Sequence, residues 1–137
     1  MAALLVICSK SSYARACYST FFVKLGGVKI ASYQCFIGKN VSMDGVRPDL
    51  IFIEKNAIIT AGTVILTHFA NSKGRWYYGE VHIGEHAFIG IRTIITKPVS
   101  IGKDAMVGAG SIVTKDIPDY EVWAGNPARF VKKRNEN

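Results

Sequence analysis

Three histidines, His68, His82 and His86, are the side chains in this sequence best suited to proton exchange near neutral pH. His68 stands directly before residues 69–80, a polar and aromatic stretch that differs from the chain on either side. A histidine beside such an excursion is expected where the fold opens to solvent, and there it can act as a general base on a bound hydroxyl group. His82 precedes a core position and His86 lies in a turn, so we expect both at the surface.

The cysteine, serine and charge content narrows the chemistry further. No serine or cysteine stands in a recognisable nucleophile motif, so we expect direct group transfer without a covalent enzyme intermediate. Three cysteines without Cys-x-x-Cys spacing favour a reducing compartment over a disulfide framework. The net charge of +7 favours an anionic ligand. The basic residues are spread along the chain and form no nucleic-acid-binding motif.

A repeat of six residues indicates the elements that position these groups. Two positions of each hexad stay small or branched, one directly after an aliphatic residue and one four residues after it. A period of six fits neither a helix nor a flat strand, and it is typical of a parallel β-helix, in which three hexads make one triangular coil. The same repeat continues upstream, out of phase, through Ile37 and Met43. The aliphatic positions in the main frame are Ile53, Ile59, Ile65, Ile83, Ile89, Ile95, Ile101, Val107 and Val113.

The hexad predicts how the coils stack. Each aliphatic residue should point inward and lie on its equivalents in neighbouring coils, about 4.8 Å away. The small residue should sit near a corner, where glycine supplies turn freedom and a larger side chain would clash. We therefore predict an all-β chain with Ile83 and Ile101 stacked in adjacent coils. A sandwich of short strands is the alternative, and it would show wider, less regular turn spacing. The aliphatic outer faces favour a symmetric oligomer.

The chain is expected to form one domain behind a short capping segment. Residues 1–27 are expected to form an N-terminal helical cap, and residues 28–137 the coil with its tail. The apolar run near the start is too short for a signal peptide or a membrane span. Contact of this segment with a membrane surface is a less favoured alternative. Residues 41–50 and 69–80 interrupt the repeat, and the second interruption is expected to be a functional loop extending from a corner.

Three segments of the sequence match a known family. They read ILTH at 65–68, VHIG through FIG at 81–90, and VGAGSIVTKDIP with AGNPAR at 107–118 and 124–129. With these segments the chain resembles the hexapeptide-repeat acetyltransferases, and within them the maltose, galactoside and polysaccharide sugar O-acetyltransferases. The resemblance implies a left-handed β-helix, a homotrimer with active sites between subunits, and acetyl-CoA as co-substrate without a metal. A zinc site like that of hexapeptide carbonic anhydrases is disfavoured because His82 and His86 share one hexad.

The resemblance also implies site residues. His68 falls where the family places its catalytic base, and the backbone amide near Gly90 and Ile91 falls where it stabilises the oxyanion. Lysine and arginine suit the phosphates of acetyl-CoA. The family's coenzyme contacts correspond to Ala109, Thr114, Lys115, Arg129 and Lys132.

The acceptor pocket is the least defined part of the predicted site. Aromatic rings can stack on the apolar faces of sugars, and the excursion contains an aromatic run. The same rings could instead anchor the loop against a neighbouring subunit. Phe88 stands where relatives often carry a tryptophan. The candidate acceptor contacts are Asp44, Asn71, Arg75, Trp76, Tyr77 and Phe88.

Together these features predict an acetyl-CoA-dependent O-acetyltransferase that acts on a sugar or surface-polysaccharide precursor in the cytoplasm. Alternative enzyme activities are N-acetylation of an amino sugar and O-acetylation of serine. An alternative of another class is a non-catalytic β-helix that serves as an assembly subunit. His68 beside the excursion, together with the Thr114-Lys115 pair, favours the enzyme over the assembly subunit.

Overall fold

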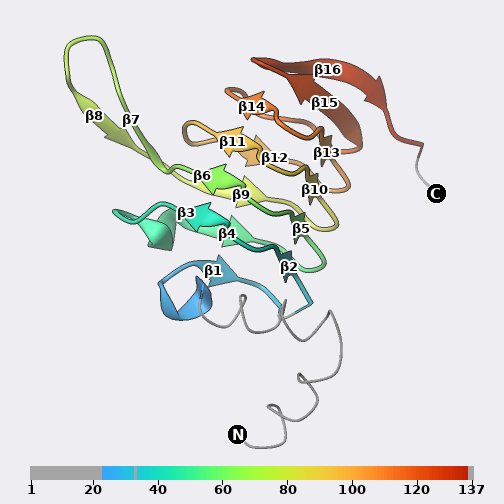
Figure 1. Ribbon diagram of the computed structural model, residues 1–137, viewed down its shortest axis with the longest axis horizontal. Coiled ribbons are helices and arrows are strands. Elements are labelled where there is room, and N and C mark those ends of the chain that lie inside the picture. Colours follow the sequence, from blue (N-terminus) through green and yellow to red (C-terminus); the bar gives the residue numbers. More distant parts are fainter. Residues whose placement is uncertain (1–22, 33, 136–137) are drawn as a thin grey trace, which may run out of the picture.

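The computed structural model describes residues 23–32 and 34–135, which form a stack of triangular coils (Figure 1). The described residues build three parallel sheets that form the sides of a prism, here named sheets A, B and C. Sheet A contains β1 (Lys29–Ile30), β4 (Ile51–Ile53), β9 (Val81–Ile83) and β12 (Ser100–Ile101). Sheet C contains β3 (Ser42–Met43), β6 (Val64–Ile65), β11 (Ile94–Ile95) and β14 (Ile112–Val113).

Sheet B is the longest side and ends in an antiparallel pair. It contains β2 (Phe36–Ile37), β5 (Ile58–Ile59), β10 (Phe88–Ile89), β13 (Met106–Val107), β15 (Glu121–Gly125) and β16 (Ala128–Lys133). β15 lies parallel to β13, whereas β16 folds back antiparallel on β15 at the C-terminal end of the coil. The all-β class predicted from the repeat is therefore confirmed.

The stacking predicted from the six-residue repeat is also confirmed. Ile83 pairs with Ile101 in β12 and with Ile53 in β4. All nine aliphatic positions of the main frame are at most 1% exposed. The compact residues four positions further on are buried as well, including Ala87 and Ala105 at 0%. The inward side chains of the short strands therefore fill the prism together with these compact residues.

The small residues after the aliphatic positions are required by the close approach of the next coil. A Cβ atom on Gly84 would lie 2.6 Å from the carbonyl carbon of Gly102, and one on Gly90 would lie 2.5 Å from the nitrogen of Ala109. Neither glycine has a positive φ. The left-handed backbone falls two residues later in the hexad, for example at His86, where φ is 56°. The expected steric restriction is therefore present at the small residue, but the left-handed turn conformation is adopted two residues later.

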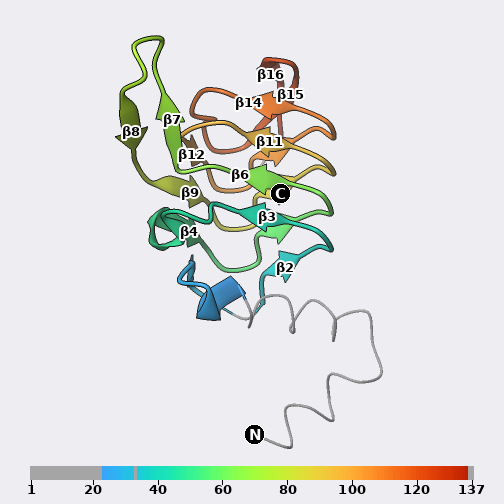
Figure 2. The same cartoon turned by 60° about the vertical axis from the view of Figure 1, so that its left-hand side comes forward.

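Both interruptions of the repeat lie at the edge where sheet C passes into sheet A. The first follows β3 and contains a short 3-10 helix, Pro48–Leu50, before β4 begins. The second follows β6 and is the predicted extruded loop, which forms an antiparallel hairpin of β7 (His68–Ala70) and β8 (Trp76–Tyr78). Figure 2 shows this hairpin projecting beyond the coils. Because β3 pairs with β6, the two interruptions are neighbours in space.

The outer faces of the three sheets differ in polarity. The register aligns Lys29, Phe52, His82 and Ser100 along the outside of sheet A. The outside of sheet C carries Ser42 followed by an apolar row, and the outside of sheet B is apolar throughout the parallel part. These apolar rows are Val64, Ile94 and Ile112 on sheet C, and Phe36, Ile58, Phe88 and Met106 on sheet B.

The expected N-terminal cap, residues 1–27, falls mostly outside the described residues; of those described, Val23 to Leu25 are helical. Strand β1 begins the coil at Lys29, close to the expected start at residue 28. Among the residues that the structure describes, no helix has the length and hydropathy needed to cross a bilayer.

Candidate active site

His68 begins β7 at the point where the chain leaves the prism. Its side chain is 20% exposed, and its Nδ1 atom lies 2.5 Å from Oδ2 of Asp44. Asp44 directly follows β3, and the pairing of β3 with β6 brings it beside the residues that precede His68. A carboxylate and an imidazole that are 24 residues apart in the chain thus meet at one edge of the prism.

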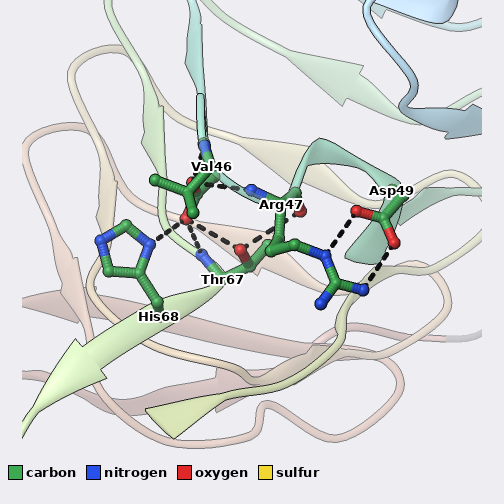
Figure 3. A network of polar contacts seen from close by, with 6 residues as sticks. Val46, Arg47, Asp49, Thr67 and His68 are labelled. Atoms are coloured by element: carbon green, nitrogen blue, oxygen red, sulfur yellow. Dashed lines mark hydrogen bonds and ion pairs between the residues drawn. The ribbon is translucent and has the colours of Figure 1, made fainter. Parts of the chain in front are cut away.

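Asp44 is buried, with 2% of its surface exposed, and both of its oxygens are occupied (Figure 3). Oδ1 accepts hydrogen bonds from the backbone N–H groups of Val46 (2.8 Å) and Arg47 (3.3 Å). Oδ2 accepts from the N–H and the hydroxyl group of Thr67, each at 2.8 Å, in addition to His68. The Thr67 hydroxyl also lies 3.3 Å from the carbonyl oxygen of Arg47. This network fixes the carboxylate against the base of the hairpin.

These hydrogen bonds keep the carboxylate ionised. Burial by itself would raise the pKa of Asp44, but the donors from Thr67, Val46 and His68 outweigh it and hold that pKa far below its usual range. An ionised Asp44 accepts the proton on Nδ1 of His68, which assigns the tautomer of the ring. Nε2 then carries the free lone pair, and this nitrogen points away from the network in Figure 3. The pair is arranged to accept a proton from a group outside the prism.

The hairpin surrounds His68 with aromatic rings. The ring centroid of Trp76 lies 5.3 Å from that of His68, and that of Tyr78 lies 5.9 Å away. Trp76 is 58% exposed and Tyr78 is 51% exposed. Tyr77 lies elsewhere, stacked on Phe69 with ring centroids 5.2 Å apart and an interplanar angle of 17°.

Three other residues expected to contact the acceptor have different surroundings. Asn71 shapes the hairpin turn, since its Oδ1 accepts from the N–H groups of Lys73 (2.9 Å) and Arg75 (3.0 Å). Arg75 is exposed near the hairpin tip. Phe88 lies on the outer face of sheet B, away from the edge that carries the hairpin.

An open apolar groove of about 640 Å³ runs along sheet B and along the turns that connect sheet B to sheet C. Three residues expected to contact the coenzyme line it: Gly90 is buried, Ile91 is 50% exposed and Ala109 is exposed. The other lining residues are Phe36, Gly38, Lys39, Thr60, Ala61, Phe88, Met106, Val107 and Gly108. At the turns the lining is mostly of small residues, Gly38, Ala61, Gly90, Gly108 and Ala109, which leave room for a thin, flexible ligand arm.

The basic residues expected to bind the coenzyme lie at the C-terminal end of the coil. Lys115 is exposed just after β14, where Thr114 is half-buried. Arg129 and Lys132 are exposed on β16, and Arg129 Nη1 donates to the carbonyl oxygen of Ala128 at 3.2 Å. Figure 1 shows β14, β15 and β16 together at that end.

The groove and His68 lie on different edges of the same prism. The groove follows sheet B and the turns from sheet B to sheet C, whereas His68 stands where sheet C passes to sheet A. A single copy of the chain therefore does not bring the base and the groove together.

The two remaining histidines are held in surface contacts. His82 stacks on Phe52 at a centroid distance of 4.6 Å, and its Nε2 lies 2.8 Å from Oε2 of Glu80. His86 Nε2 lies 3.0 Å from Nδ2 of Asn56. In residues 23–32 and 34–135, no three His, Cys, Asp or Glu side chains gather in a geometry that could hold a metal ion.

The sequence did not reveal that Asp44 contacts His68. It placed Asp44 among the acceptor contacts, whereas the structure buries it behind the imidazole. The available signal was the position of the two interruptions, 41–50 and 69–80, which lie near equivalent aliphatic residues, Met43 and Ile65. Residues that follow equivalent positions of stacked coils lie next to each other.

Comparison with known proteins identifies a family with the same six-residue repeat. The family described as the hexapeptide repeat of succinyl-transferase matches residues 34–67 and 80–115. Protein CapG of Staphylococcus aureus is 39% identical over 116 residues, which cover 77% of this chain and 66% of CapG. The chain thus spans slightly less than two thirds of that relative.

Two solved structures are similar over most of the chain. A mutant of AntD, an N-acyltransferase from Bacillus cereus in complex with dTDP and coenzyme A, matches with a TM-score of 0.72 and 27% identity, over 80% of this chain and 64% of that one. A galactoside acetyltransferase in complex with coenzyme A matches with a TM-score of 0.67 and 25% identity, over 97% of this chain and 78% of that one. The coil is the left-handed parallel β-helix predicted from the resemblance.

Proposed function

The chain belongs to the hexapeptide-repeat transferase family, and on that premise we propose that it is an acetyl-CoA-dependent O-acetyltransferase of a sugar or surface-polysaccharide precursor. The observation that carries the proposal is the Asp44–His68 pair, in which a buried carboxylate orients an imidazole whose second nitrogen faces outward. A structural assembly subunit has no need for such a pair. The structural similarity to a galactoside acetyltransferase supports a sugar acceptor.

In the proposed reaction, His68 acts as the general base. Nε2 accepts the proton of the acceptor hydroxyl as its oxygen bonds to the acetyl carbonyl carbon, and the thioester C–S bond breaks in the following step. The proton on His68 then goes to the leaving coenzyme thiolate, so the ring returns to its starting tautomer. Asp44 touches no substrate; it is a positioning residue that holds Nδ1 and stabilises the imidazolium form.

The carbonyl oxygen of the acetyl group needs a hydrogen-bond donor as it becomes negatively charged. The Gly90 N–H already donates to the carbonyl oxygen of Val107 at 2.8 Å. The Ile91 N–H has no acceptor among the residues that the structure describes, and Ile91 lines the groove. We assign the Ile91 amide as the oxyanion donor.

Acetyl-CoA is the proposed co-substrate, since AntD and the galactoside acetyltransferase were both solved with coenzyme A. The apolar groove fits the pantetheine arm, and Gly90, Ala109 and Gly108 leave room for it along the coil. Thr114, Lys115, Arg129 and Lys132 at the C-terminal end of the coil are proposed to contact the rest of the coenzyme, its phosphates pairing with the basic side chains. A reducing cytoplasm is the proposed location, since the sequence has three cysteines without Cys-x-x-Cys spacing.

A homotrimer is the proposed working unit. Two sides of the prism, sheets B and C, have apolar outer rows, while sheet A is polar along most of its length. Packing these two sides against neighbouring copies would cover them in a closed ring. The same packing would place the groove of one copy beside His68 of the next copy. In a single chain the groove and His68 lie on different edges.

N-acetylation of an amino sugar is the second candidate, favoured by the similarity to the N-acyltransferase AntD. The test is coenzyme release from acetyl-CoA by the purified protein with four acceptor classes: methyl glycosides, nucleotide sugars, amino sugars and serine. We expect release with hydroxyl sugars and its loss in the His68→Ala variant. Release with amino sugars alone would select the second candidate, and no release above hydrolysis with any class would contradict both.

A further inference from the structure

The β7–β8 hairpin has two aromatic faces with different partners. Its register pairs His68 with Tyr78, Phe69 with Tyr77, and Ala70 with Trp76. Side chains alternate between the faces of a two-stranded ribbon, so residues directly opposite each other share a face. One face therefore carries His68, Ala70, Trp76 and Tyr78, and the other carries Phe69 and Tyr77.

The face that carries His68 presents open aromatic surface. Trp76 and Tyr78 are more than half exposed, and each has its ring tilted toward the imidazole, by 52° and 39°. The residue opposite Trp76 is Ala70, whose small side chain leaves the indole uncovered. None of the four positions on this face holds a lysine, arginine, aspartate or glutamate. A ligand on this face meets flat apolar rings next to a proton acceptor.

On the opposite face of the hairpin, the two aromatic side chains contact each other. Phe69 and Tyr77 stack on each other, with ring centroids 5.2 Å apart. The Tyr77 hydroxyl oxygen accepts a hydrogen bond from Nδ2 of Asn71 at 3.2 Å, and Asn71 also shapes the turn. Tyr77 thus stiffens the hairpin from the side away from His68, and it lies on the other face from Trp76 and Tyr78.

We propose that Trp76 and Tyr78 form a platform that stacks against the apolar C–H face of one pyranose ring of the acceptor, and so holds a ring hydroxyl at Nε2 of His68. This assignment rests on the proposed acetyl transfer. It makes the acceptor a glycoside, because exposed aromatic rings offer a flat apolar surface for the C–H face of a sugar ring. Serine has no ring to stack and is excluded from this role.

Steady-state kinetics of paired variants test the platform. Trp76→Ala and Tyr78→Ala should each raise the KM for the best glycoside found in the acceptor screen by at least about tenfold, with the KM for acetyl-CoA unchanged. Tyr77→Phe, which removes the Asn71 contact but keeps the ring, is the matched control and should leave both KM values within about twofold. Equal effects of Trp76→Ala and Tyr77→Phe, or loss of the oligomer in Trp76→Ala by sedimentation, would overturn the proposal.

Fluorescence supplies a readout that does not depend on turnover. The chain has two tryptophans, so the Trp123→Phe variant reports on Trp76 alone. Titration with methyl glycosides of galactose, glucose, mannose and N-acetylglucosamine should shift or quench this emission, and titration with serine should not. Quenching without coenzyme release would contradict the proposed transfer but support the platform. Release with a glycoside that never perturbs Trp76 would contradict the platform alone.

Discussion

Oδ2 of Asp44 lies 2.5 Å from Nδ1 of His68. The two residues come from neighbouring coils, at the edge between sheet C and sheet A where both interruptions of the repeat lie. The contact follows from strand register, since Met43 and Ile65 pair and each is followed by one of the two interruptions. The first interruption supplies the buried carboxylate, and the second supplies the imidazole and the aromatic platform. The candidate site is therefore built by two departures from regularity at one edge.

His68→Ala should lower kcat by about 10²–10⁴-fold, because a positioned general base contributes that much. Acetyl-CoA binding, measured by calorimetry, should remain, since His68 is not among the residues that line the groove. His82→Ala is the matched control and should be nearly silent, because His82 contacts Phe52 and Glu80 on the outside of sheet A. Full activity in His68→Ala together with inactivity in His82→Ala would move the active site elsewhere.

Asp44→Asn should lower kcat by more than about tenfold but by no more than His68→Ala does, because it acts only through the imidazole. An amide in place of the carboxylate can turn a donor toward Nδ1, which favours the tautomer with the proton on Nε2. The acceptor and coenzyme KM values should change little. A pH profile of kcat separates this effect from general damage, since the variant should shift the profile, whereas a misfolded fraction would only scale it down.

Asp44 should also make the folded state sensitive to acid. The pKa of Asp44 is lower in the folded chain than in the unfolded chain, where it is about 4. The carboxylate therefore contributes stability above about pH 4, and that contribution is lost as the pH falls below this value toward the folded pKa. The difference in melting temperature between wild type and Asp44→Asn should be largest near pH 7 and shrink in acid. A difference that stays constant with pH would contradict this account.

Lys115→Ala and Arg129→Ala should raise the KM for acetyl-CoA and reduce its dependence on salt. Each charged contact with a phosphate is worth roughly 1.5–3 kcal/mol, or about ten- to 150-fold in affinity. Both residues are exposed at the C-terminal end of the coil. Lys55→Ala is the control, since Lys55 pairs with Glu85 at 3.1 Å on another part of the surface. Calorimetry showing unchanged acetyl-CoA binding in both variants would refute the assignment.

Ile94→Lys should dissociate the proposed trimer, because it places a charge within the apolar outer row of sheet C. Ser100→Lys adds the same side chain to the outer face of sheet A and should leave the assembly intact. Sedimentation of both variants beside the wild type checks this. Loss of acetyl transfer should accompany dissociation, because the groove and His68 of one chain lie on different edges. An active monomer would show that one copy is sufficient.

The coil could be predicted from the sequence because its repeat is local. In residues 83–113 an inward aliphatic residue recurs at every sixth position, and the pairing of Ile83 with Ile101 is one consequence of this spacing. The interruptions break that count, so the spacing between paired coils changes from 18 residues for Ile83 and Ile101 to 22 for Met43 and Ile65. The contact of Asp44 with His68 depends on the second spacing, which the sequence alone does not define.

The sequence predicts a loop that extends from a corner, and it also contains a signal for the hairpin that this loop forms. Residues 71–74 read Asn-Ser-Lys-Gly between two aromatic segments, and turn residues between β-forming runs are a hairpin signal. Gly74 adopts a φ of +72° in that turn. The alternation of side chains across the hairpin then separates Trp76 from Tyr77, which adjacency in the sequence had grouped together.

The neck of the hairpin is closed by the Gly79 N–H, which donates to the carbonyl oxygen of Thr67 at 3.0 Å, so the chain leaves and re-enters the coil at nearly the same point. Ile65 and Ile83, on either side of the hairpin, are both fully buried in the prism. A segment attached in this way behaves as an exchangeable cassette. Under the proposed function, replacement of residues 69–78 would change which acceptor is recognised, while the stacked coils, the buried carboxylate and the groove would be kept.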